Sequence, residues 1–195
     1  MHIDATFYPL AHKIWLVATI IAVVLNDKEK GLNQAQKAVA ADPQSATAQI
    51  ALSYARQARF DLEGARTSVE AAVKRDPGNA IAWARLADLR ASFGELGKAL
   101  EAAKKAESLA PDLALTQTVL GFALLTQVNI DESMAAFEKA ITLDQAAPLP
   151  RLGLGLAKIR KGALDEGGRE IEIAAGLEIH PIPFAQGEFS VSGVV

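Results

Sequence analysis

Residues 80–113 read AIAWARLADLRASFGELGKALEAAKKAESLAPDL. Apolar residues recur in the first part of this stretch at three- and four-residue intervals, which is the spacing of one helix face and not the alternation of a strand. Pro111 follows the second part. Because a proline lacks the N–H of a helical hydrogen bond and its ring clashes with the preceding turn, it ends a helix. The stretch therefore predicts a helical hairpin, two helices joined by a short turn.

The same pattern recurs along the chain at a fixed interval. Pro43, Pro77 and Pro111 are 34 residues apart, and further series keep the same phase, as a stack of similar units requires. Most of these positions carry small residues, which allow two helices to approach closely where they cross. The series are Ala38, Ala72, Ala106, Ala140 and Ala174; Leu52, Leu86, Leu120 and Leu154; Thr19, Ser53, Ala87, Gly121 and Gly155; and Gly31, Ala65, Ala99, Ser133 and Gly167.

The composition is that of one folded domain. The chain has 195 residues, 50% of them apolar and 22% charged, which provides enough apolar surface to offset the entropy lost on folding. It contains no cysteine, so disulfides, cysteine-based zinc sites and thiol catalysis are excluded. The formal net charge of −3 lacks the positive surplus that dominates nucleic-acid binding, so we expect no nucleic-acid partner.

The pattern resembles the tetratricopeptide repeat. Residues 80–113 match it best, residues 46–79 and 114–147 match in part, and residues 12–45 and 148–181 match more weakly. The positions that carry the resemblance in the best unit are Trp83, Leu86, Ala87, Gly94, Ala99, Ala106 and Pro111. The resemblance implies an all-α, right-handed α-solenoid of about five repeats over residues 12–179, between an N-terminal leader (1–11) and an irregular tail (180–195).

The resemblance also implies that the first helix of each repeat lines a concave groove. The residues that we expect to form the partner-binding groove are Leu16, Ile20, Ile50, Tyr54, Asp88, Phe122, Leu125, Leu152, Leu156 and Ile159. This set is mainly apolar, and Tyr54 and Phe122 are the rigid aromatic anchors. The cationic clamp by which some family members hold a carboxylate is missing, and Asp88 would repel one. We therefore predict a non-catalytic scaffold that binds an apolar peptide or helix of a partner protein; packing against neighbouring helices is the alternative role for each side chain.

The segment 14–25 is a continuous apolar run, IWLVATIIAVVL. It is short for a membrane span, and Trp15 and Thr19 keep the repeat phase, so the first helix of the first repeat is favoured over an anchor or a signal peptide. Such a helix is apolar all round, so one side is exposed unless residues 1–11 or a second subunit cover it, and homo-oligomers through this end of the chain are a hypothesis. The second hypothesis for function is thus a self-associating or membrane-anchored envelope component. Pro181 and Pro183 end the helical pattern at the other terminus.

No constellation of residues predicts chemistry. His2, His12 and His180 are too dispersed for a metal site, and carboxylates such as Glu170 are interpreted as solvated surface. We expect no cofactor, no metal and no enzymatic activity, because function must be argued from a site. A cytoplasmic location is favoured, with a periplasmic or envelope location as the alternative. The partner, the oligomeric state and whether the chain belongs to a longer repeat array are left open.

Overall fold

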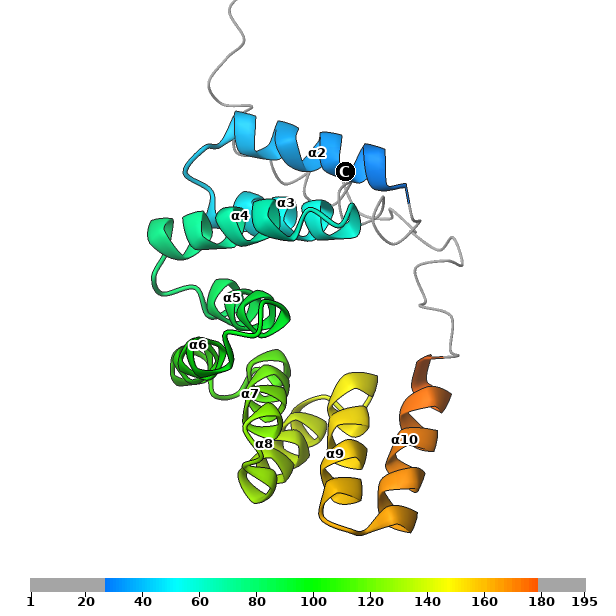
Figure 1. Ribbon diagram of the computed structural model, residues 1–195. Helices are drawn as coiled ribbons and strands as arrows, with labels where there is room; N and C mark the ends of the chain where they lie inside the picture. Colours follow the sequence, from blue (N-terminus) through cyan, green and yellow to red (C-terminus); the bar gives the residue numbers. More distant parts are fainter. Residues whose placement is uncertain (1–26, 179–195) are drawn as a thin grey trace, which may run out of the picture.

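The computed structural model describes residues 27–178, which form an all-α solenoid of nine helices arranged in an arc (Figure 1). The helices that come first in each hairpin are α3 (Ala46–Ala58), α5 (Ala80–Ser92), α7 (Ala114–Thr126) and α9 (Pro148–Arg160). The second helices are α2 (Lys28–Ala41), α4 (Leu62–Arg75), α6 (Leu96–Leu109), α8 (Ile130–Leu143) and α10 (Leu164–Glu178). The predicted fold is confirmed for this part of the chain.

The helix boundaries repeat with the period of the sequence. The first helices begin at residues 46, 80, 114 and 148, and the second helices begin at 28, 62, 96, 130 and 164, so both sets advance by 34 residues. Helices α2, α4 and α6 each end two residues before a proline of the Pro43 series. Helix α8 ends at the same point of its repeat although Gln145 replaces the proline, so the turn does not depend on it.

Close helix crossings explain the series of small residues. A Cβ atom added to Gly167 of α10 would lie 2.6 Å from the backbone oxygen of Gly155 in α9. Gly121 of α7 and Gly153 of α9 both face the ring of Phe137, which is fully buried in α8. An added Cβ would lie 2.5 Å from that ring at Gly121 and 2.3 Å at Gly153. The predicted role of the small residues in close packing is confirmed at these positions.

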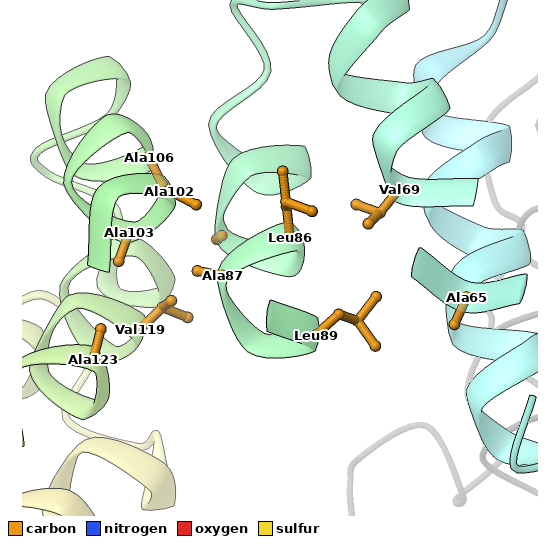
Figure 2. Close-up of a cluster of buried hydrophobic side chains, with 11 residues drawn as sticks. Ala65, Val69, Leu86, Ala87, Leu89, Ala102, Ala103, Ala106, Val119 and Ala123 are labelled. Carbon is orange, nitrogen blue, oxygen red and sulfur yellow. The ribbon is translucent and has the colours of Figure 1, made fainter. Parts of the chain in front are cut away.

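The core is a chain of apolar clusters, each shared by neighbouring hairpins. The largest joins α4, α5, α6 and α7, and Figure 2 shows Leu86 and Leu89 of α5 directed toward Val69 and Ala65 of α4. A second cluster, around Phe137, joins α7, α8 and α9. Because each hairpin packs on its neighbours, the stability of the array is distributed along its length.

The turn within each hairpin needs one residue with a positive φ angle. This residue is Phe60 (φ 64°), Gly94 (φ 74°), Val128 (φ 63°) or Gly162 (φ 95°), again at intervals of 34 residues. Glycine adopts this left-handed conformation without strain, whereas valine, being β-branched, does so at a cost. Two of the four turns therefore carry a residue poorly suited to them.

Several sequence predictions concern residues outside the described range. These are the leader 1–11, the apolar segment 14–25 with Leu16 and Ile20, and the tail 180–195.

The interpretation of Glu170 as solvated surface is wrong. Its carboxylate lies in the α9–α10 hairpin, 3.3 Å from Nη1 of Arg151 and 3.0 Å from Nζ of Lys158, with a side chain only 17% exposed.

Candidate functional site

The first helices form the inner layer of the arc. Each contacts the next one, α3 with α5, α5 with α7 and α7 with α9. Within residues 27–178, the second helices make no such contacts with one another, although each packs on the first helices beside it. Since elements on the inside of a bend lie closer together than those on the outside, the first helices line the concave side and the second helices the convex side (Figure 1).

Two rows of side chains cross the inner layer, one residue from each first helix. We call these eight residues the inner surface. The first row is Thr47, Ile81, Leu115 and Leu149, and the second row is Tyr54, Asp88, Phe122 and Leu156. All eight are exposed except Phe122, which is partly buried. Six of the eight are aliphatic or aromatic, so the inner surface offers apolar area to a partner on a rigid helical frame.

The structure divides the eight predicted groove residues that it describes into three groups. Tyr54, Asp88 and Leu156 are exposed on the inner surface, and Phe122 lies partly buried between them and the core. Leu152 and Ile159 are also partly buried.

Ile50 and Leu125 are buried, at 7% and 6% exposure. Ile50 packs with Ala46, Ala72 and Ala82, and Leu125 packs with Phe137. Both residues therefore contribute packing in this arrangement, and the contact area comes from the exposed residues.

Phe122 is held in place by the core. Its ring meets the ring of Phe137 edge to face, with centroids 4.9 Å apart and an interplanar angle of 73°. This is a favourable geometry for two aromatic quadrupoles. The Phe122 ring is thus fixed by α8, and the side chain remains partly exposed.

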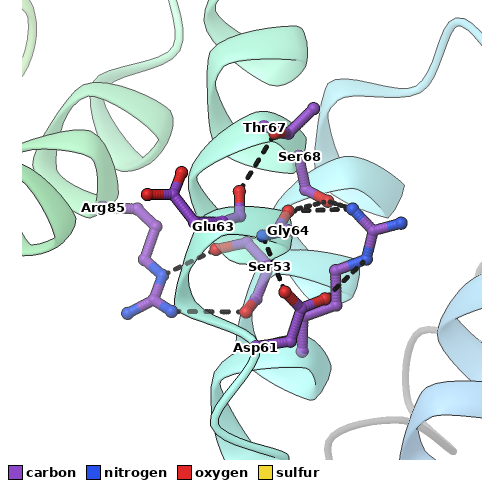
Figure 3. A network of polar contacts seen from close by, with 8 residues as sticks. Ser53, Asp61, Glu63, Gly64, Thr67, Ser68 and Arg85 are labelled. Carbon is purple, nitrogen blue, oxygen red and sulfur yellow. Dashed lines mark hydrogen bonds and ion pairs between the residues drawn. The ribbon is translucent and has the colours of Figure 1, made fainter.

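A buried arginine, Arg85, joins α5 to α3 beneath the second row. Its Nε donates to Ser53 Oγ at 3.0 Å and its Nη2 to the Ser53 backbone oxygen at 3.4 Å, as Figure 3 shows, and Nη2 also donates to Gln57 Oε1. The guanidinium carbon lies 3.9 Å from the centroid of the Tyr54 ring, a cation–π contact. Arg85 therefore positions Tyr54 and fixes the α3–α5 crossing.

The sequence analysis missed Arg85. The signal available was a charged residue at a position where the other units carry Ala51, Val119 and Gly153. A charge in an otherwise apolar or small series needs a partner when it is buried.

Asp88 is the acidic member of the inner surface, one helical turn beyond Arg85. The surrounding protein removes part of the solvation of the Asp88 carboxyl. This disfavours the ionised form and raises its pKa from 3.8 to about 6, and the charge of Arg85 acts in the opposite direction. No cation of residues 27–178 forms an ion pair with Asp88. The inner surface thus contains one carboxylate that is accessible and poorly stabilised.

The described residues contain no group of three or more metal-binding side chains, and none of their helices has the length and apolarity needed to cross a membrane. The arrangement at the inner surface is suited to contact with another chain: aromatic and aliphatic side chains, one carboxylate and no nucleophile–base pair.

Comparisons with known proteins identify the repeat. Two family models, both described as tetratricopeptide repeat, match residues 50–114 and 116–146. The search of curated proteins gave no match.

Several solved structures share the fold. A thermophilic TPR protein of Thermus thermophilus is 21% identical, covers 90% of this chain and 94% of its own, and has a TM-score of 0.77. PilF of Pseudomonas aeruginosa is 18% identical over 87% of this chain and 77% of its own, with a TM-score of 0.72. YrrB, a TPR protein with an unusual peptide-binding site, is 16% identical over 84% of each chain, with a TM-score of 0.58.

Proposed function

This chain belongs to the tetratricopeptide repeat family, and we propose on that premise that it is a non-catalytic scaffold whose inner surface binds an apolar peptide or helix of a partner protein. The observation that carries this proposal is the alignment of six apolar side chains in two rows across four successive first helices. Their backbone is held by helix packing, so little conformational entropy is lost on binding.

The exposed side chains support binding in size as well as in position. Tyr54 is 41% exposed, Ile81 44% and Leu149 52%, although each is large and apolar. Exposed apolar side chains gathered on one side of a folded protein are typical of interaction sites, and their burial contributes about 25 cal/mol per Å². YrrB, which shares the fold, has a peptide-binding site. An extended or helical segment laid along the rows would cover residues of several repeats at once.

A peptide selection tests the proposal. A random peptide library displayed on phage would be selected against the immobilised full chain, and the enriched peptides would be synthesised and titrated by fluorescence anisotropy. We expect the double variant Leu115→Ser and Leu149→Ser to weaken their binding by at least about tenfold, because a few large apolar contacts supply most of the binding energy at such interfaces.

The matched control is Leu143→Ser, which removes an exposed leucine from the outer helix α8 and should leave binding unchanged. Failure to enrich any peptide, or equal binding by the double variant, would refute the proposal. The second hypothesis, self-association or membrane attachment through residues 14–25, concerns residues outside the described range and stays a prediction.

A further inference from the structure

We propose that the inner surface selects an apolar segment that carries one basic side chain, and that this side chain pairs with Asp88. The inference rests on the proposed function and names the chemistry of the partner. It follows from the arrangement of the second row, in which a carboxylate lies between two aromatic residues on adjacent helices.

The neighbours of Asp88 in its row are Tyr54 on α3 and Phe122 on α7. Packed helices have axes about 8–10 Å apart, so a side chain bound at Asp88 lies within reach of an aromatic ring on either side. Lysine and arginine have long apolar stems that pack on such rings while the charged group continues to an acceptor. A cation above an unoccupied aromatic face is also attracted by the ring itself, although one face of the Tyr54 ring already contacts Arg85.

Asp88 has no competing partner among the described residues. Arg85 is the nearest cation, but its Nε and Nη2 donate to Ser53 and Gln57 on α3. Partial desolvation raises the pKa of Asp88, and the charge of Arg85 opposes this rise without cancelling it. A cation brought by the partner would supply that compensation and hold the carboxyl in its ionised form.

The same carboxylate acts against other partners. A wholly apolar segment laid over the second row would remove water from Asp88 without providing a hydrogen-bond donor, which is unfavourable for a charged group. An acidic segment would add repulsion between like charges. The rest of the inner surface, with Ile81, Leu115, Leu149 and Leu156, still requires apolar side chains in the partner. One basic residue in an apolar sequence satisfies both requirements.

The test is the phage-displayed peptide selection, run in parallel on the wild-type chain and on the variants Asp88→Asn and Asp88→Lys. The matched control is Glu101→Gln, which removes the same charge from an exposed site on the outer helix α6. Circular dichroism spectra first establish that the variants fold. We expect the wild type and the control to enrich apolar peptides with a lysine or arginine, Asp88→Asn to lose this preference, and Asp88→Lys to favour an acidic residue.

A titration then measures the pairing itself. In an enriched peptide, replacing the basic residue by norleucine should weaken binding to the wild type by about tenfold and change binding to Asp88→Asn much less, because the charge pair is already lost there. Enriched peptides without a basic residue, or a basic preference that persists in Asp88→Asn, would overturn this inference and leave the scaffold proposal standing. If no peptide is enriched, the scaffold proposal fails as well. A concentration-dependent dimer that Asp88→Asn dissociates would mean that a second copy occupies the surface, which also overturns the inference.

Discussion

Gly153 of α9 packs closely against the Phe137 ring of α8, and a double-mutant cycle on them tests whether this contact sets the spacing of the last hairpins. Replacing glycine by alanine inside a helix normally raises the free energy of unfolding by about 1 kcal/mol. At Gly153 the added Cβ would lie 2.3 Å from both Cε1 and Cζ of Phe137, so the ring or the helix must move. Overpacking of this kind costs about 1–3 kcal/mol. The two effects oppose each other, so we expect Gly153→Ala to lower the free energy of unfolding by up to about 2 kcal/mol.

The sign should reverse when the ring is removed. Leucine lacks the Cε1 and Cζ atoms, so in a Phe137→Leu background Gly153→Ala should be neutral or stabilising by up to about 1 kcal/mol. The two effects differ by about 2 kcal/mol, which is within the range measured for residues in direct contact. Gly168→Ala in α10 is the control, because its added Cβ would meet nothing within 4 Å, and it should stabilise the chain in both backgrounds.

Urea unfolding followed by circular dichroism gives the four free energies of the cycle. Hydrogen exchange of the α8 and α9 amides provides a local measurement, which matters because repeat arrays do not always unfold as one unit. If Gly153→Ala has the same effect in both backgrounds, the contact does not set the spacing of α8 and α9, and the packing argument is refuted.

Two further predictions concern a turn and a titration. Gly94→Val places a β-branched residue where φ is 74°, and should lower the free energy of unfolding by about 1–2 kcal/mol in a urea titration; an unchanged midpoint would show that the turn relaxes. Because the pKa of Asp88 is raised, the folded chain retains a proton that the unfolded chain releases between pH 3.8 and about 6. The free energy of unfolding should therefore decrease as the pH rises through this range, and Asp88→Asn should make this decrease smaller. Urea midpoints measured across that range for both proteins check this, and identical pH profiles would contradict it.

The fold was predictable because its constraints are local and periodic. A residue at a helix crossing must be small, and Ala72, Ala106 and Ala140, at successive crossings, are all fully buried. A larger residue at a crossing would disrupt that hairpin, so the spacing of small residues indicates the hairpins even after α8, where Gln145 replaces the proline. The strained turns at Phe60 and Val128 were not predictable, since neither residue favours a positive φ.

The inner surface was predictable only in part, because exposure depends on contacts between repeats. Tyr54 and Ile50 both lie on the face of α3 expected to line the groove, yet Tyr54 is exposed and Ile50 packs against Ala72 and Ala82 of the next two helices. The hydrogen bonds of Arg85 join residues 28 and 32 positions apart, and no periodic rule relates them. Such pairings become visible only when neighbouring helices are placed in space.

Residues of the inner surface can be replaced without loss of the fold, because residues beneath it, such as Arg85, fix the positions of the helices. Most inner-surface residues are exposed, so replacing one alters stability by about 0.5 kcal/mol or less, and the surface is free to vary with the partner. Arg85 lies outside this set of residues: it is buried between α3 and α5 and contacts the Tyr54 ring. Its hydrogen bonds hold the α3–α5 crossing in one geometry before any partner arrives. The region beside Asp88 is therefore preorganised, and preorganisation lowers the entropy that binding must overcome.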